Sequence, residues 1–352
     1  MIKMQQRYYD LDLLRFLAAL SVVLFHYTFR GYSADNLSNI SYDEISFITK
    51  YGYLGVELFF MISGFVILMT AQSGSVKKFL ISRFTRLYPT FWIGVILTAI
   101  FIYIYKAQLF DFTIKQLLIN LTMVPKLFNT APIDGVYWTL LVELKFYFLI
   151  VLVLLFKKLD YMKLFLFLWV SWSIFFYFTH FPYKLNGILF PTYSSYFVAG
   201  AIFFMVKKEG ISVFKVSTLL ISFISSCLYS VKYLDRQIEH FNTEFSSFIV
   251  IFILFIFYLV MLLISLEKSN FFNKRIYFYL GILTYPLYLI HQNIGYILLN
   301  YYQNLNKYVL LVSIIFIMIF ISYIIYYFID NKLSSYLKAK LTNLLLKEKN
   351  VK

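Results

Sequence analysis

The chain alternates between long apolar stretches and short polar segments. A helix needs about 20 mostly apolar residues to cross the hydrocarbon core of a bilayer, and this window predicts ten membrane-spanning helices. We expect them at residues 11–29, 52–71, 88–105, 136–156, 163–180, 188–206, 213–231, 246–266, 277–299 and 308–329. The apolar stretch 116–124 is too short to span, and we expect it to form an interfacial or re-entrant part of the loop 106–135.

Composition favours the same class of protein. Of the 352 residues, 61% are hydrophobic and 14% are charged, whereas soluble domains carry about 25% charged residues. The single cysteine, Cys227, lies within an apolar stretch and excludes a disulfide-stapled secreted domain. The first stretch contains Asp12, Arg15 and His26 and has no small-residue cleavage site after it, so we do not expect a signal peptide. The expected fold is an all-α polytopic membrane protein.

The net charge of +15 predicts an orientation. With the N-terminus inside, 21 Lys and Arg lie in inner segments and 9 in outer ones, so the positive-inside rule places both termini in the cytoplasm. These cations occur in short groups between apolar stretches rather than along one stripe, which argues against a nucleic-acid partner. We expect a transmembrane domain over 1–330 and a basic tail, 331–352, that lies on the anionic membrane surface.

Ionisable residues inside the predicted spans are candidates for chemistry, because burying them in a bilayer is costly. Arg15 and His26 lie eleven residues apart, about three helical turns, and so share a face of the first helix. Glu143 and His291 are expected at a similar depth to His26, in the outer half of the membrane. Two His and one Glu suit general acid–base catalysis, or a proton relay in a transporter. Structural explanations stay open: a hydrogen-bonded His, an Asp12–Arg15 pair and a Glu143–Lys145 ion pair.

Further candidates lie beside these groups. Tyr285 and Tyr288 precede His291 at intervals of three residues along one helical stripe. In the second predicted helix, Glu57 lies near the outer end and Ser63 is placed to hydrogen-bond across the bundle. The glycines of that helix favour close helix packing over ligand binding; they are Gly52, Gly55 and Gly64.

A basic cytoplasmic loop, 77–89, follows the second predicted span. Arg83 and Arg86 lie one turn apart in it, with Lys77 and Lys78 nearby. An Arg pair suits bidentate phosphate contacts, although ordinary anchoring of the chain explains such charges equally well. The sequence has no metal-binding signature, Gly-rich phosphate loop or GxSxG motif.

Five motifs occur in a fixed order along the chain. They are Arg15-x10-His26, GVELFFMISGF at 55–65, SRFTR at 82–86, WTLLVELKFY at 138–147 and TYPLYLIH at 284–291. In this order the chain resembles the membrane acyltransferase-3 family of bacterial O-acyltransferases, from about residue 7 to 330.

This resemblance implies a multi-pass enzyme of the bacterial inner membrane that moves an acyl group, usually acetyl, from cytoplasmic acyl-CoA to a hydroxyl of a cell-envelope glycan. Acyl-CoA is then a substrate, and no permanently bound cofactor is expected. The motifs imply catalytic roles for His26, Glu143 and His291, and donor binding by Arg15, Arg83 and Arg86. The remaining substrate-site candidates are Trp138, Tyr285, Tyr288, Glu57 and Ser63. Larger members append an extracytoplasmic hydrolase-like domain for acyl relay; we expect none here, so a relay would use the same helices or a partner.

The resulting hypothesis is that Arg83 and Arg86 hold the CoA phosphates while the pantetheine arm enters the bundle. His26, oriented by Glu143, then takes the proton of the attacking hydroxyl. The competing class is a transporter or flippase of a lipid-linked sugar, which would need inverted repeats or broken helices that the sequence does not show. A polysaccharide polymerase or a scaffold subunit is a third alternative, and a large outer loop would favour the polymerase.

Overall fold

The computed structural model describes residues 7–179, 184–269 and 273–346, and within these ranges the chain forms helices and no strand. The α-helices are α1 (Tyr9–Phe25), α2 (Gly31–Ser33), α3 (Asp43–Thr49), α4 (Gly55–Ala71), α5 (Val76–Ile104), α6 (Ile114–Asn120), α7 (Trp138–Leu155), α8 (Met162–Thr179), α9 (Asn186–Leu189), α10 (Pro191–Glu209), α11 (Val213–Phe241), α12 (Ser247–Ser265), α13 (Tyr277–Tyr301), α14 (Lys307–Ile325) and α15 (Ser334–Leu346). The 3-10 segments are η2 (Gly52–Leu54), η3 (Gln108–Phe110), η4 (Pro125–Phe128), η5 (Gly135–Tyr137) and η6 (Leu159–Tyr161), and the π-helical segments are η1 (His26–Arg30) and η8 (Tyr326–Leu333).

The expected all-α polytopic fold is confirmed. Eight helical segments of the described chain are long and apolar enough to cross a membrane. The two predicted spans outside this set coincide with α10 and α13, which have 19 and 25 residues. Most residues of both helices are buried. Because they contact other helices rather than lipid, they carry polar side chains that a lipid-facing helix would replace with apolar ones.

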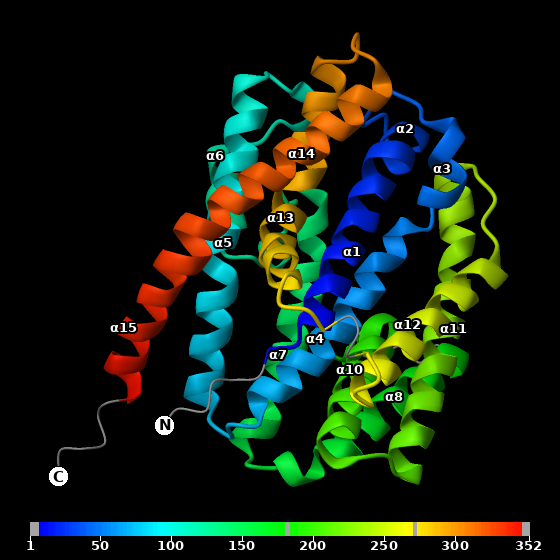
Figure 1. The fold of residues 1–352 in the computed structure, drawn as a ribbon, viewed down its shortest axis with the longest axis vertical. Coiled ribbons are helices and arrows are strands. Elements are labelled where there is room, and N and C mark those ends of the chain that lie inside the picture. Colours follow the sequence, from blue (N-terminus) through cyan, green and yellow to red (C-terminus); the bar gives the residue numbers. More distant parts are fainter. Residues whose placement is uncertain (1–6, 180–183, 270–272, 347–352) are drawn as a thin grey trace.

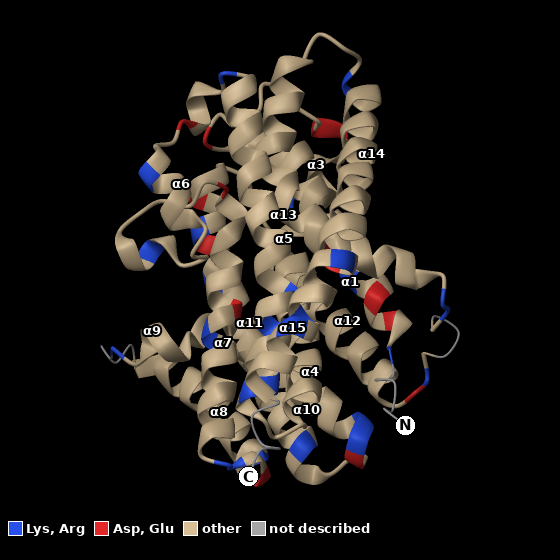
Figure 2. Cartoon of the chain, turned by 90° about the vertical axis from the view of Figure 1, so that its left-hand side faces the viewer, with Lys and Arg blue, Asp and Glu red and all other residues tan. Residues whose placement is uncertain are grey.

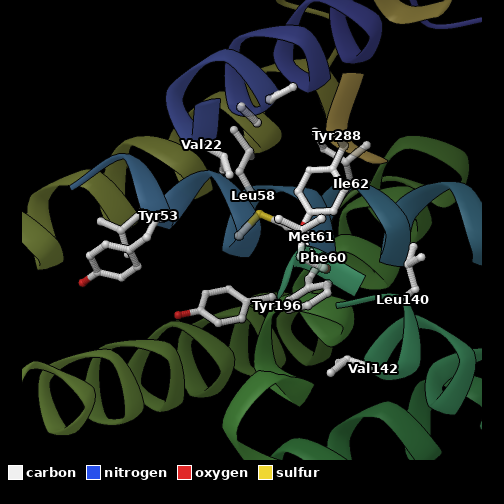
Figure 3. Close-up of a cluster of buried hydrophobic side chains, with 14 of the residues drawn as sticks. Val22, Tyr53, Leu58, Phe60, Met61, Ile62, Leu140, Val142, Tyr196 and Tyr288 are labelled. Atoms are coloured by element: carbon white, nitrogen blue, oxygen red, sulfur yellow. Dashed lines mark hydrogen bonds between the residues drawn. The ribbon is translucent and has the colours of Figure 1, made fainter. Parts of the chain in front are cut away.

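The centre of the bundle is a close contact between α4 and α10. Gly64 lies against the backbone of Phe197, and Gly200 lies against the carbonyl of Met61, so a Cβ at either glycine would collide with backbone atoms. Figure 3 shows Met61 among the surrounding buried side chains, which include Tyr196 of α10. Lipid is as apolar as the helix surfaces, so such close packing of small residues is what favours association in a membrane.

Glycines also hold α1 between α4 and α13. Gly55 lies against the carbonyl of Ala18, and Gly281 of α13 lies against Asp12. Near the other end of α1, Gly295 packs against the ring of Tyr27. The packing role expected for the glycines of the second span is confirmed at Gly52, Gly55 and Gly64.

Two segments expected as loop or tail are instead helical. α5 begins at Val76, with the Ser75 hydroxyl accepting from the Lys78 amide, so the predicted loop 77–89 forms the first turns of this helix. The predicted boundary at residue 330 falls inside η8, which joins α14 to α15 in one helical run, Lys307–Leu346. Residues 347–352 of the expected tail lie outside the described residues. Figure 1 shows α15 beside the lower part of α5, and the two helices are in contact.

The stretch 116–124 overlaps α6, a helix of seven residues that is too short to span. It packs beside α5, where the Trp92 indole donates to the carbonyl of Leu121 at 3.0 Å. Its last residue, Asn120, is fully buried and accepts from the amide of Ile133 at 2.9 Å. These bonds fold the 106–135 loop back on the bundle.

Candidate active site

Two histidines from different helices meet inside the bundle. His26 is the first residue of η1 and His291 lies in the middle of α13. Nε2 of His291 lies 3.1 Å from Nδ1 of His26, and the ring centroids are 5.0 Å apart. Both side chains are buried. The sequence places these two residues at one depth, and the structure brings them into contact.

The neighbouring carbonyls determine which ring nitrogens carry protons. Nδ1 of His26 lies 2.9 Å from the carbonyl oxygen of Val22, and Nδ1 of His291 lies 2.8 Å from that of Tyr288. A carbonyl only accepts, so in the neutral rings both Nδ1 atoms carry the proton. The one proton on His26 Nδ1 is then shared between the Val22 carbonyl and Nε2 of His291, and Nε2 of His26 is the basic nitrogen of the pair.

A π-helical segment positions His26. In η1 the Thr28 hydroxyl donates to the carbonyl of Leu24 at 2.7 Å. The Tyr27 hydroxyl donates to the carbonyl of His291, also at 2.7 Å. Segments of this kind are rare and occur frequently at functional sites. Here η1 ties the end of α1 directly to the turn of α13 that carries the second histidine.

Glu143 does not join this pair. Its Oε1 accepts hydrogen bonds from the hydroxyls of Ser63 at 3.1 Å and Tyr147 at 2.6 Å. The expectation that Glu143 orients His26 is therefore wrong, because the side chain that His26 contacts is His291. Nor does Glu143 form the alternative ion pair with Lys145, within the described part of the chain.

Glu143 lines an inner chamber of about 200 Å³ between α1, α4, α5, α7 and α13. The chamber walls include most of the sequence-predicted polar residues, which are Arg15, Ser63, Arg83, Arg86, Glu143, Tyr285 and Tyr288. The Tyr285 hydroxyl donates to the carbonyl of Leu87 at 3.0 Å. The structure thus separates the predicted site into a polar chamber and a histidine pair.

Tyr288 lies between these two parts. Its ring lines the inner chamber and lies 5.6 Å from the ring of His291, while its carbonyl accepts from that histidine. Its hydroxyl is 2.9 Å from the Thr139 hydroxyl. Tyr288 therefore contacts both the chamber and the histidine pair.

A wider vestibule of about 460 Å³ adjoins the chamber. Arg15, Arg83 and Arg86 line both cavities. Two further cations, Arg7 and Lys338, line the vestibule but not the chamber. Figure 2 shows Lys and Arg residues gathered around α15, the helix that contributes Lys338 to the vestibule. Three arginines expected to act together are thus brought to one passage.

The carboxylates of the vestibule pair with only some of these cations. The Asp12–Arg15 ion pair considered from the sequence is present at 3.9 Å, but Arg7 is the closer partner of Asp12, with its Nε at 2.7 Å. Arg83 donates to the hydroxyls of Ser82 and Thr70 at 3.1 and 3.4 Å. Among the described residues, no carboxylate lies within ion-pair distance of Arg83.

Asp330 was missed by sequence reasoning. In η8 its carboxylate lies 2.9 Å from Arg86 Nη1 and accepts from the Thr90 hydroxyl at 2.6 Å. It holds Arg86, one of the three predicted donor-binding arginines, in place. The only sequence signal was a single acidic residue at the inner end of an apolar run.

Asp134 was also missed. It is fully buried, and it accepts from the amides of Val136 and Asn293 at 3.1 and 3.0 Å. The Asn293 side chain in turn donates to the carbonyl of Ile133 at 2.8 Å. These bonds join the segment before η5 to the turn of α13 that follows His291.

Two of the substrate-site candidates, Glu57 and Trp138, do not line the chamber. Glu57 is buried at 7% exposure, and among the described residues its Oε2 has no hydrogen-bond partner. Trp138 packs against the rings of Phe60 and Tyr193, with centroids 6.3 and 5.3 Å away. No group of three or more potential metal ligands occurs in the described residues.

Residues 8–327 match the family model described as an acyltransferase domain. The match contains both histidines and Glu143, and it ends three residues before Asp330. No curated protein and no solved structure is significantly similar to the chain.

Proposed function

The chain belongs to the acyltransferase family whose model its residues 8–327 match, and from this membership we propose that it moves an acetyl group from acetyl-CoA to a hydroxyl of a cell-envelope glycan at the bacterial inner membrane. The observation that carries the proposal is the arrangement of the two cavities. A cationic vestibule leads into a narrower chamber, and a buried histidine pair lies behind one tyrosine.

The donor side of the proposal rests on the shape and charge of the passage. CoA carries its negative charge on phosphates at one end and its thioester at the other. Arg15, Arg83 and Arg86 line the junction of the two cavities, where Arg guanidinium groups suit a diphosphate. The uncharged pantetheine arm then occupies the inner chamber, and the vestibule faces the cytoplasm.

Glu143 takes a donor-positioning role in this scheme instead of orienting His26. Both hydroxyl donors, Ser63 and Tyr147, bond to its Oε1. Oε2 is the oxygen assigned to accept an amide N–H of the pantetheine arm. Pantetheine contains two such amides, and a carboxylate is a strong acceptor for them.

His26 is the general base. The glycan hydroxyl attacks the thioester carbonyl carbon as Nε2 of His26 takes its proton. When the carbon–sulfur bond breaks, the imidazolium returns that proton to the leaving thiolate, so the products are the acetyl ester and free CoA. His291 accepts from Nδ1–H of His26 and stabilises the tautomer in which Nε2 is the base. The thioester reaches this nitrogen when the Tyr288 side chain turns away from Thr139.

The acceptor approaches from the opposite end. Aromatic rings and an unpartnered carboxylate oxygen suit a sugar, whose faces stack on rings and whose hydroxyls donate to carboxylates. Trp138, Tyr193 and Glu57 supply these groups near the outer ends of α4, α7 and α10.

Binding of acetyl-CoA to the purified protein in lipid nanodiscs tests the donor assignment. We expect the double substitution Arg83→Gln with Arg86→Gln to raise the Kd at least tenfold. Arg275→Gln, an arginine that lines neither cavity, is the matched control and should leave the Kd within twofold. Equal affinities for all three proteins would show that these arginines only anchor the helix.

A further inference from the structure

The C-terminal helix forms one wall of the vestibule. Asn331, Ser334, Ser335 and Lys338 line it, and their spacing of three, one and three residues places them on one face of the helical run. Residues of α5, among them Arg83 and Arg86, line the same vestibule, and α15 is in contact with α5. The sequence alone suggested only a basic tail.

The stripe contains polar groups that the protein itself does not satisfy. Ser334 is 8% exposed, and its Oγ has no hydrogen-bond partner among the described residues. Buried hydroxyls are normally bonded, so such a group indicates a missing partner. Lys338 has no carboxylate within ion-pair distance in the described chain, whereas Arg7 and Arg86 in the same vestibule are both paired.

The position of Lys338 relative to the arginines selects the ligand group. Arg15, Arg83 and Arg86 line both cavities, but Lys338 lines only the vestibule and is therefore farther from the inner chamber. In CoA the diphosphate is joined to the pantetheine arm, and the ribose 3′-phosphate lies beyond it. With the arm in the chamber, the 3′-phosphate is the anion that lies farthest out.

We propose that the stripe Asn331–Ser334–Ser335–Lys338 binds the ribose 3′-phosphate of the CoA donor. Lys338 supplies the positive charge and the serine hydroxyls donate hydrogen bonds to the phosphate oxygens. This inference rests on the proposed function, because it assumes a CoA thioester in the inner chamber. It makes the C-terminal helix a specificity element for the donor rather than a membrane anchor.

Lys340 provides a matched control on the same helix. It lies two residues beyond Lys338 and does not line the vestibule, and its Nζ is 5.9 Å from the ring centroid of Tyr336. Lys338→Glu and Lys340→Glu change the net charge equally. Any difference between them therefore reports on the vestibule and not on the overall field of the protein.

The test compares CoA with dephospho-CoA, which lacks only the 3′-phosphate, by calorimetric titration in nanodiscs of phosphatidylcholine, a lipid without net charge. We expect the unmodified protein and Lys340→Glu to bind CoA at least tenfold more tightly than dephospho-CoA. Lys338→Glu should abolish that preference while binding dephospho-CoA as before. An equal preference in both variants would overturn the inference, even if CoA binds. Failure of the unmodified protein to bind either compound would instead overturn the proposed function.

Discussion

Nε2 of His291 lies 3.1 Å from Nδ1 of His26, and the Nδ1 atoms of both rings face backbone carbonyls. His291 is therefore a hydrogen-bond acceptor for His26 and sets the tautomer of the proposed base. A second contact holds it in place, since its own carbonyl accepts from the Tyr27 hydroxyl. The pair is built by α1 and α13 together, and neither helix alone defines it.

His291→Leu should lower kcat for acetyl transfer by about tenfold, because the His26 Nδ1 proton loses one of its two acceptors and the developing imidazolium is less stabilised. The Kd for CoA should stay within twofold, since His291 does not line either donor cavity. His291→Gln, whose Oε1 still accepts a hydrogen bond, should recover part of kcat. A loss of CoA affinity equal to the loss of kcat would indicate a general packing defect.

Glu143→Gln should raise the Kd for CoA about tenfold, the order expected when a hydrogen bond to a charged acceptor is lost. Adenosine 3′,5′-bisphosphate has no pantetheine arm and should bind as before. Ser63→Ala removes only one donor to Oε1 and should have a smaller effect. If Glu143→Gln and Ser63→Ala weaken CoA binding equally, the carboxylate is a structural acceptor and has no direct role in donor binding.

Asp330→Asn should lower the free energy of unfolding by about 1–3 kcal/mol. This loss is smaller than that for a fully buried ion pair, because the Arg86 side chain is 43% exposed and solvent screens the interaction. The carboxylate of Asp330 bonds both Arg86 and Thr90, and α15 continues from the same segment. Thermal unfolding in detergent measures this change. An unchanged Tm would mean that the ion pair does not help to hold α15 in place.

The stability contribution of Asp134 should depend on pH. Burial raises the pKa of Asp134 from 3.8 to about 6, so the folded state binds its proton more tightly than the unfolded state. The contribution of Asp134 to the free energy of unfolding is complete below about pH 4, where the carboxyl is protonated in both states. It is lost as the pH rises through the folded-state pKa of about 6, and the total loss is about 3 kcal/mol at most. In Asp134→Asn that loss should disappear. Parallel Tm curves for both proteins between pH 4 and 7 would contradict the assignment.

The spans were predictable because a bilayer imposes length and apolarity on each helix separately. The His26–His291 contact was likewise within reach, since counting turns places both residues at one depth. The same counting could not predict the partners of Glu143, because helical rise gives the height of a residue along one helix and not the lateral distance between two helices. Charged residues at helix ends are normally solvated, so nothing in the sequence distinguished Asp330 or Asp134 from ordinary surface groups.

The sequence pattern also did not predict that α5 begins at Val76, because charged residues fall within its first turns. Lys77, Lys78, Arg83 and Arg86 interrupt the apolar pattern, which predicts a loop. Their long side chains let a helix extend beyond the hydrocarbon region while the charges stay in water or in the vestibule. The same holds for α15, where the polar stripe resembles a solvated tail until α5 is seen beside it.

The most direct test of the account is acetyl transfer by membranes that contain the chain with and without the base. Membrane vesicles from bacterial cells that express the unmodified chain or His26→Ala, inserted at equal levels, are given acetyl-CoA labelled in the acetyl group. We predict that label enters glycan material only with the unmodified chain, while both proteins bind CoA with the same affinity. Equal labelling by His26→Ala would contradict the central claim that His26 is the base of an acetyl transfer.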